Sequence, residues 1–280
     1  MTGTYGNIRD YAFSEHKEAF NVLLTVFNAF HLRYSLIGAQ AKDMHFFQKG
    51  IKPARGTRDI DFAVMVESMD QYNELINVLK VKGFAGTNDP YRLNWKEGET
   101  VIDLLPFGQI EQDYTVNFDQ REIELSVLGY RELNEELQEY FLDEDRSVAI
   151  PVPPLHGIFI LKLLSWHDKK PAREKDLRDL SQILENYWEF VKDEAYEKHL
   201  DLFEEDFEIG KAAARILGRH LKATLDKSAV LKEKIKHILE EQAAAFDPPG
   251  LMLQKFAEDK DRPIEHVKIL LDEILKGVNE

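Results

Sequence analysis

Three aspartates in two short apolar runs constrain this chain more than any other feature of its sequence. Residues 58–64 read RDIDFAV and residues 101–105 read VIDLL. Because successive side chains of a β-strand point to opposite faces, a strand over the first run places Asp59 and Asp61 on the same face. If the strand that carries Asp103 lies beside it, three carboxylates converge on one small region, where they repel one another unless a cation lies among them. The pattern therefore predicts a site for a hard divalent metal such as Mg²⁺, with these three aspartates as ligands.

The simpler interpretation of an Asp-x-Asp pair is two carboxylates on a solvated strand face. The residues that flank these aspartates are strongly apolar, however, as in a strand that is mostly buried. A buried carboxylate without a partner costs several kcal/mol or loses its charge, so we prefer the metal-site interpretation. Mg²⁺ held by a few carboxylates and by substrate phosphates is the apparatus of phosphoryl or nucleotidyl transfer.

A candidate phosphate-binding turn precedes the aspartates. Residues 34–38 read YSLIG and predict a short buried strand, and a helix is predicted to begin at Ala39. At such a junction the free backbone N–H groups and the helix dipole attract an anion, and a glycine lets a phosphate approach the backbone. Many strand–helix turns use glycine for conformational reasons alone, so it is the nearby acidic cluster that favours a binding role for Gly38 and Ala39. Gln40 and Ser35 could add hydrogen bonds to a phosphate, and a structural role for either is the equal alternative.

The composition bounds the class of protein and its partners. The 280 residues carry a formal net charge of -15 and no cysteine. The missing cysteine excludes disulfides, thiolate nucleophiles and Cys-based zinc sites, and the histidines show no metal-ligand spacing. The acidic charge works against broad binding to a nucleic-acid backbone, although it allows a local basic groove. The N-terminus lacks the basic and apolar regions of a signal peptide, and no apolar run is long enough to cross a bilayer, so we expect a cytoplasmic protein without a membrane partner.

The order of predicted elements indicates an α+β fold in two domains. The first, residues 1–145, alternates strands and helices and contains a hairpin whose turn is residues 96–99. The second, residues 150–280, is all helical, and the proline-containing segment 143–154 lies at the junction. The predicted strands of the first domain are 34–38, 59–66, 91–95, 100–106 and 123–128, and its predicted helices are 14–32, 39–47 and 69–82. The predicted helices of the second domain are 155–166, 173–190, 194–203, 209–225, 231–246 and 263–275.

These motifs together resemble those of a known superfamily. A strand, a glycine with a small residue and a helix, followed by an Asp-x-Asp strand and a third aspartate on a neighbouring strand, is the signature of the polymerase-β-like nucleotidyltransferases. The stretch RGTRDIDF at 55–62 is most similar to the minimal bacterial and archaeal branch that includes the AbiEii-type toxins. The resemblance implies that Asp59 and Asp61 bind the metal ions, expected to be two Mg²⁺, and that Asp103 supplies the third carboxylate.

The same resemblance assigns the triphosphate of a bound NTP to Gly38 and its neighbour. The chain departs from the superfamily at Ala39, where Gly or Ser is usual; losing a serine hydroxyl would remove one phosphate contact but keep the backbone N–H. We add Gln40 and Arg58 as candidate nucleotide contacts.

The helical half extends the resemblance. The segments around Lys162 and at 173–180 are similar to the helices that follow the core in the toxin-like branch, where a lysine and an acidic residue face the active site. By that resemblance Lys162 would touch the triphosphate, while Lys175, Asp176 or Asp179 would line the cleft, over which the helical domain closes. The alternative is that Lys162 caps a core helix and that the charges of 173–180 form a salt-bridged exposed face.

The predicted function is a Mg²⁺-dependent transfer of NMP from an NTP to an acceptor hydroxyl, with Asp103 as the best candidate to orient or deprotonate the acceptor. Toxin-like relatives suggest an RNA or protein acceptor and a cognate antitoxin as a partner. Two alternatives stay open: a small-molecule acceptor such as an aminoglycoside, and a catalytically inactive binding module, which the alanine at Ala39 keeps in view.

Overall fold

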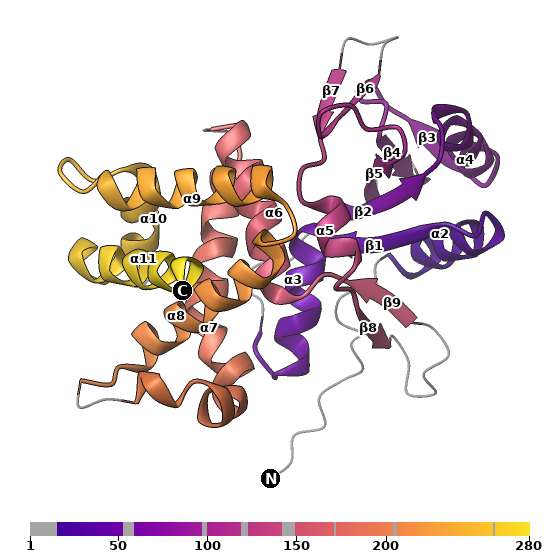
Figure 1. Cartoon of the computed structure of the whole chain (residues 1–280). Helices are drawn as coiled ribbons and strands as arrows, with labels where there is room; N and C mark the ends of the chain where they lie inside the picture. Colours follow the sequence, from indigo (N-terminus) through magenta and orange to yellow (C-terminus); the bar gives the residue numbers. More distant parts are fainter. Residues whose placement is uncertain are drawn as a thin grey trace. The chain divides into compact units, whose positions relative to one another are not determined.

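The computed structural model describes residues 16–52, 59–96, 100–118, 123–141, 149–170, 172–203, 206–259 and 261–280. The chain divides into two compact units, Met1–Pro154 and Leu155–Glu280 (Figure 1). The first unit mixes strands with helices and the second is helical, which is the α+β organisation that the sequence predicts. Among the described residues, no helix combines the length and apolarity that a membrane span needs.

The elements of the first unit are α2 Lys17–Ala29, β1 Arg33–Ile37, α3 Gly38–Gln48, β2 Asp59–Val66, α4 Met69–Val81, β3 Phe84–Gly86, β4 Arg92–Trp95, β5 Thr100–Gly108, β6 Thr115–Phe118, β7 Ile123–Ser126, α5 Tyr130–Asn134, β8 Gln138–Phe141 and β9 Ala149–Val152. Those of the second unit are α6 Leu155–Asp168, α7 Glu174–Lys198, the 3₁₀ turn η2 Leu200–Leu202, α8 Ile209–Leu225, α9 Ala229–Ala244, α10 Leu251–Glu258 and α11 Ile264–Asn279.

A five-stranded mixed sheet in the order β1-β2-β5-β4-β3 is the centre of the first unit. β2 and β5 run parallel, and the other neighbouring pairs are antiparallel. The β4–β5 hairpin predicted from the sequence is present, with Trp95 paired to Thr100 across the turn. The registers of the four strands β1, β2, β5 and β4 align one residue from each in a single row, which consists of Ile37, Asp61, Asp103 and Arg92.

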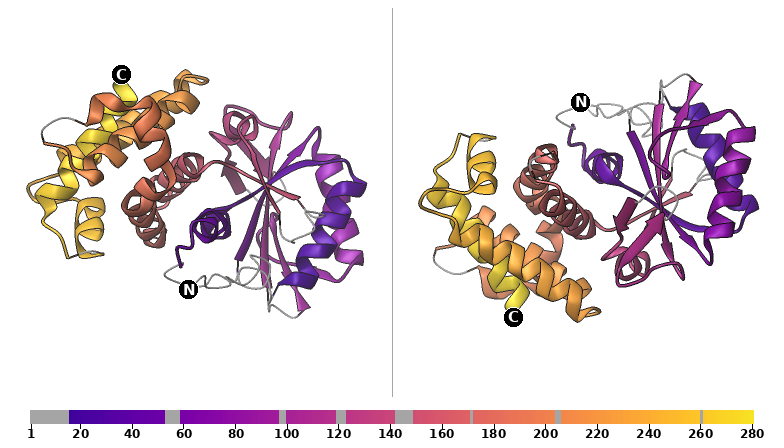
Figure 2. Two further views of the ribbon diagram at one scale, coloured as in Figure 1. Left: turned by 90° about the horizontal axis from the view of Figure 1, so that it is seen from below. Right: turned by 90° about the horizontal axis from the view of Figure 1, so that it is seen from above.

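Helices α2 and α4 cover one face of this sheet (Figure 2). The rings of Phe20 and Phe27 in α2 lie 5.5 and 5.2 Å from that of Phe62 in β2. In α4, the hydroxyl of Tyr72 donates a hydrogen bond of 2.8 Å to the carbonyl of Leu104 in β5. Because side chains alternate along a strand, the residues next to Phe62 and Leu104 belong to the other face. The predicted acidic cluster is therefore on the sheet face that α2 and α4 leave uncovered.

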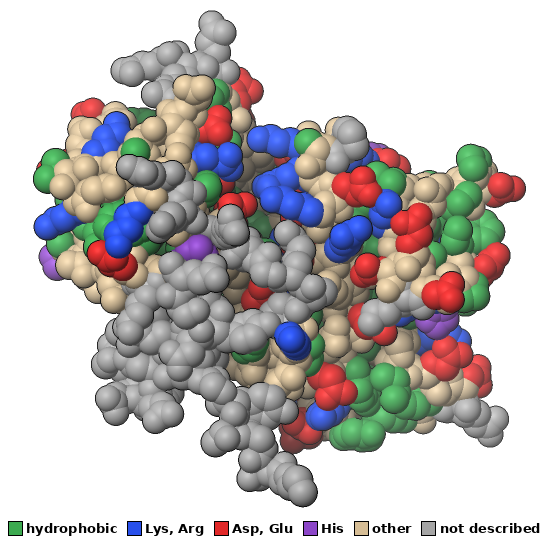
Figure 3. All heavy atoms as spheres, turned by 180° about the vertical axis from the view of Figure 1, so that it is seen from behind, with side chains coloured by type: hydrophobic (Ala, Val, Ile, Leu, Met, Phe, Trp, Pro, Cys, Tyr) green, Lys and Arg blue, Asp and Glu red, His purple; other side chains and the backbone are tan. Residues whose placement is uncertain are grey.

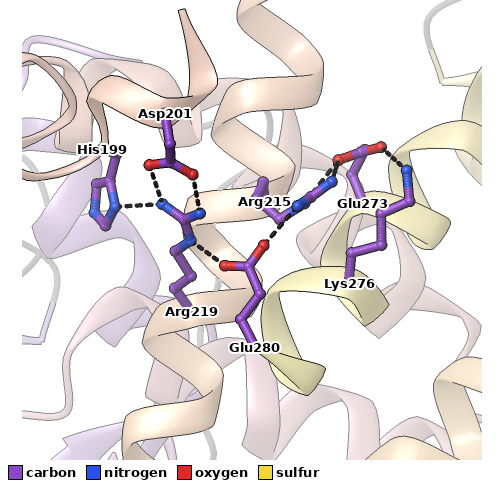
Figure 4. A network of polar contacts seen from close by, with 7 residues as sticks. All are labelled: His199, Asp201, Arg215, Arg219, Glu273, Lys276 and Glu280. Atoms are coloured by element: carbon purple, nitrogen blue, oxygen red, sulfur yellow. Dashed lines mark hydrogen bonds and ion pairs between the residues drawn. The ribbon is translucent and has the colours of Figure 1, made fainter.

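In the helical unit, α8 and α11 approach each other closely where two glycines meet. A Cβ at Gly218 would lie 2.2 Å from the carbonyl oxygen of Ile274, and one at Gly277 would lie 2.2 Å from that of Arg215. Only a residue without a side chain allows this approach at either position. A polar network between Arg215, Arg219, Glu273 and Glu280 lines the same pair of helices (Figure 4).

The helical unit differs from the sequence prediction in two places. Two helices were expected at 173–190 and 194–203, but α7 runs without a break from Glu174 to Lys198. Val191 and Ala195 are buried and continue the apolar stripe across the expected break, so packing maintains the helix there. Helix α10 was not expected, because an eight-residue helix offers too few turns to establish a period.

Candidate active site

Strand pairing brings the predicted aspartates to one face of the sheet. Asp61 in β2 and Asp103 in β5 occupy paired positions in adjacent parallel strands, so their side chains point to the same side. Asp59 lies two residues before Asp61 and shares that face. Asp103 is buried and the other two are partly exposed. The sheet therefore places three carboxylates on two neighbouring strands next to the start of α3.

Gly38 lies directly against this acidic group. It follows β1 and begins α3 with a φ of 74°, in the left-handed region, and a Cβ built on it would lie 2.0 Å from Oδ2 of Asp61. Glycine is thus required both by the backbone angle and by the carboxylate. The N-cap residue Ile37 makes no side-chain cap hydrogen bond, and the first-turn N–H groups of a helix are a common binding place for an anion.

Gln40 in the first turn of α3 has a feature that needs an explanation. Its side chain is 2 % exposed, and among the described residues neither its amide nitrogen nor its amide oxygen has a hydrogen-bond partner. An unsatisfied buried polar group costs about 1–3 kcal/mol. A polar ligand at the turn would remove this cost, whereas an apolar packing role would not. Ala39, between Gln40 and Gly38, is partly exposed.

Arg92 is a member of the site that the sequence analysis did not name. Its Nε and Nη2 donate to Oδ1 and Oδ2 of Asp103, both at 2.7 Å. This hydrogen bonding to Asp103 raises the pKa of Arg92 further above its ordinary value. Asp59, Asp61 and Asp103 are not among the groups of described residues whose ligand atoms all lie within 4.8 Å of one another. The carboxylate of Asp103 is held by the guanidinium instead.

The turn of the β4–β5 hairpin contains the signal that could have revealed Arg92. Trp95 pairs with Thr100, and counting three positions back along one strand and three forward along the other places Arg92 opposite Asp103. An arginine directly across from a carboxylate on neighbouring antiparallel strands lies within reach of an ion pair.

The helical unit holds the other predicted charged group. The ammonium of Lys162 in α6 lies 3.0 Å from Oδ1 of Asp176 and 2.6 Å from Oδ2 of Asp179, both in α7. All three side chains are buried, and Nε of Arg173 lies 3.4 Å from Oδ2 of Asp176. Burial lowers the pKa of Lys162, but the carboxylates of Asp179 and Asp176 outweigh burial and raise it above the ordinary value. Lys175 is exposed.

Structure therefore groups some of the predicted residues and separates others. Gly38 and Asp61 touch, Asp59 and Asp103 share their sheet face, and Lys162 and Asp176 form a buried ion pair within the helical unit. Arg58, which was predicted to contact the nucleotide, lies outside the described residues.

Replacing Lys162 with Met is expected to destabilise the helical unit strongly. The substitution keeps the volume but leaves Asp176 and Asp179 buried without their shared cation, a loss of about 3–5 kcal/mol when one partner of a buried pair is removed. Urea unfolding followed by circular dichroism measures the change. Lys175→Met, on the exposed side of α7, is the control and should change the free energy of unfolding by less than about 0.5 kcal/mol. Equal stability of the two variants would contradict a structural role for the Lys162 ion pairs.

Comparison with known proteins identifies the family. Residues 46–262, more than half of the chain, match the sequence model of a family described as nucleotidyl transferase AbiEii toxin, type IV TA system. This range contains all three aspartates and Lys162 but begins after the turn at Gly38. No curated protein sequence matches the chain.

Two solved structures are similar in outline. One is the crystal structure of an antigenic nucleotidyltransferase-like protein from Paracoccidioides brasiliensis, at 16% sequence identity and a TM-score of 0.40, covering 77% of this chain and 94% of that one. The other is the solution structure of the antibiotic-resistance factor ANT(2'')-Ia, at 10% identity and a TM-score of 0.35, covering 67% of this chain and 94% of that one. On the family match, this chain belongs to the AbiEii family of nucleotidyl transferase toxins.

Proposed function

We propose that this nucleotidyltransferase uses Mg²⁺ to transfer NMP from an NTP to an acceptor hydroxyl at the sheet face that carries Asp59, Asp61 and Asp103. The observation that supports this most directly is the contact between Asp61 and the turn at Gly38, because it joins a candidate metal ligand to a candidate phosphate cradle. A nucleoside triphosphate complexed with a metal needs both of these features side by side.

The residues present fit the proposed metal. Carboxylate oxygens are the ligands that Mg²⁺ prefers, and β2 and β5 present three carboxylates on one face. Asp59 and Asp61 would hold the ions, of which we expect two, and Asp103 would add the third carboxylate. When bound, the metal would neutralise charge that develops on the triphosphate and on the leaving pyrophosphate.

The start of α3 would hold the triphosphate. The N–H groups of a first helical turn and the helix dipole attract negative charge, and Gly38 leaves room for a phosphate to approach the backbone. Ala39 keeps its backbone N–H for this purpose, and the buried amide of Gln40 would gain the partner that it lacks among the described residues. Arg58, Lys162, Lys175 and Asp176 stay as predicted nucleotide contacts, which the KM for NTP in single variants would test.

Asp103 would act on the acceptor. A carboxylate that is almost fully buried can accept the proton of an acceptor hydroxyl as that oxygen attacks the α-phosphorus. Arg92 donates to each carboxylate oxygen, so a metal or a proton must use the remaining lone pairs of Asp103 or displace Arg92. We propose that Arg92 holds Asp103 in position in the absence of substrate.

Variants of this pair separate a catalytic role of Asp103 from a structural one. Asp103→Asn is expected to lower kcat by about 100-fold or more, because the neutral amide can neither accept the proton nor offer a negatively charged ligand to a metal. Arg92→Ala is expected to retain most of kcat and to reach half-maximal rate at a lower Mg²⁺ concentration, because the cation that competes for Asp103 is gone. Steady-state transfer assays over a Mg²⁺ titration measure both. Equal losses of activity and of stability in the two variants would show that the pair is only structural.

The acceptor is proposed to be a macromolecular hydroxyl, on RNA or on a protein, because the chain belongs to a family of toxins. The chain carries 51 acidic and 36 basic residues, and acidic and basic side chains are interspersed on the face drawn in Figure 3. A net charge of -15 works against binding along a nucleic-acid backbone, so an RNA acceptor would be bound at one end rather than along its length. A cognate antitoxin is the proposed partner.

The proposal is tested by offering the purified chain each of the four α-³²P-labelled NTPs with Mg²⁺, in the presence of total RNA or of cell-extract protein. We expect label in one of the two acceptor fractions, and none of it when EDTA is present. Growth arrest on expression that Asp59→Ala abolishes would support the toxin role. If no acceptor is labelled and isothermal titration shows NTP binding that does not depend on Mg²⁺, the chain is a binding module and the proposal is wrong.

A further inference from the structure

A second candidate metal site lies in the helical unit. Glu194 in the last turn of α7, His199 at the C-terminal end of that helix and His220 in α8 bring one ligand atom each to within 4.8 Å of one another. It is the single group of three such side chains found in the described parts of the chain. We propose that these three residues form a structural Zn²⁺ site, which goes beyond NMP transfer and lies outside the aspartate cluster.

The distances are close to those that zinc requires. Nε2 of His220 lies 3.3 Å from Oε2 of Glu194, and Nε2 of His199 lies 3.7 Å from Oε1 of the same carboxylate. Ligand bonds of about 2.0–2.2 Å in a tetrahedron place ligand atoms about 3.3 Å apart. These two distances end on different oxygens of Glu194, and the three ligand atoms lie within 4.8 Å of one another, so they must draw closer together to hold the ion. The partly exposed side chains leave a fourth position for a water molecule.

The surroundings of the two histidine rings also point to a ligand. His199 is 9 % exposed, and within the described structure its Nε2, which faces Glu194, has no hydrogen-bond partner. On the other ring, Nδ1 of His220 lies 2.7 Å from the hydroxyl of the buried Tyr187. A hydroxyl in this place can accept a hydrogen bond from Nδ1–H, which leaves the lone pair of Nε2 for a metal, as the outer partners of metal-bound histidines do. Burial lowers the pKa of both imidazoles, which favours the neutral form that a metal ligand needs.

The donor set distinguishes this site from the one on the sheet. Two imidazole nitrogens and one carboxylate suit a borderline cation such as Zn²⁺ and do not suit Mg²⁺, which prefers oxygen ligands and keeps its waters. The ligands come from the end of α7 and from α8, so a bound ion would tie these two helices together. The histidine positions in the sequence gave no sign of this, because the ligands meet only through the packing of α7 on α8.

Arg219 competes with metal binding, because it holds His199 in the tautomer that cannot bind zinc through Nε2. Its Nη1 lies 2.8 Å from Nδ1 of His199, and it also bonds to Asp201, as Figure 4 shows. A guanidinium can only donate, so Nδ1 of His199 accepts here and the neutral ring carries its proton on Nε2. Zinc on Nε2 requires the other tautomer, whose Nδ1–H must displace Arg219. Metal binding therefore depends on the release of this contact.

The experiment uses the full chain without an affinity tag, stripped with EDTA and dialysed. Isothermal titration with ZnCl₂ is expected to show one ion per chain with a Kd in the micromolar range or tighter, which excess Mg²⁺ does not displace. Co²⁺ in place of zinc is expected to show the visible absorption of a tetrahedral site, and Zn²⁺ is expected to raise the Tm of the wild-type chain. No binding and no Tm shift in the wild-type chain would overturn the proposal without any variant.

Variants then assign the ligands. His220→Gln is expected to weaken zinc binding by more than about 100-fold, and Tyr187→Phe by about 10-fold, as for a partner in the outer shell. His237→Ala, an exposed histidine of α9, is the control and should bind as the wild type does. Arg219→Met is expected to bind zinc more tightly, because His199 is then free to change tautomer. Unchanged affinity in His220→Gln would overturn the site, and weaker binding in a folded Arg219→Met would remove His199 from it.

Discussion

Replacing Asp61 with Asn is expected to reduce NMP transfer by about 100- to 1,000-fold or more, because it removes the charge at the point where the sheet meets the phosphate turn. The amide has the shape of the carboxylate and leaves the strand and the contact with Gly38 in place, so the fold should be retained. It is neutral, however, and a poor ligand for a hard divalent cation. Asp59→Asn is expected to behave in the same way, since that residue shares the sheet face.

The measurement is kcat at saturating NTP over a range of Mg²⁺ concentrations, with circular dichroism to verify folding. Asp70→Asn is the matched control, because Asp70 is exposed in the first turn of α4, the helix that covers the opposite face of the sheet. It makes the same chemical change and should keep wild-type activity. Full activity in Asp61→Asn would rule out this sheet face as the active site, whatever happens to the control.

The sequence predicts the acidic strand well because each of its signals is local. Asp59 to Val66 alternates charged and apolar residues at its start and then becomes fully apolar, and the structure begins and ends β2 at these residues. The turn at Gly38 is similarly local, since a strand that ends in a glycine before a helix needs no distant partner to be recognised. That a side chain at Gly38 would collide with Asp61 is a tertiary fact and could not be read from the spacing.

The residues and contacts that the sequence does not predict depend on which helices and strands pack together. Arg92 follows from the hairpin register, but a single arginine in a four-residue strand carries no signal until that register is counted. Glu194, His199 and His220 are separated along the chain and meet only because α7 packs against α8. The partners of Lys162 lie one helix away, and sequence could name both Asp176 and Asp179 but could not show that the lysine binds both.

Replacing Gly38 with Ala is expected to abolish transfer and to lower stability together. The backbone angle of 74° costs an L-residue about 1–2 kcal/mol. The added methyl group would lie 2.0 Å from Oδ2 of Asp61, a distance that no real contact allows, so the carboxylate must move. A displaced Asp61 can no longer hold a metal beside the first turn of α3. Activity is therefore lost because the carboxylate of Asp61 is displaced, although every polar group of the site is still present.

Gly83→Ala separates these two effects, because Gly83 has a φ of 107° in the same unit but no carboxylate of the described residues within 4 Å of its Cβ. The nearest atom there is Cζ3 of Trp95 at 3.3 Å, which can give way slightly. Both variants should lose at least about 1–2 kcal/mol in urea unfolding, but only Gly38→Ala should lose kcat. An equal loss of kcat in Gly83→Ala would show that backbone strain alone explains the result. Retained kcat in Gly38→Ala would show that transfer does not depend on the contact between the phosphate turn and Asp61.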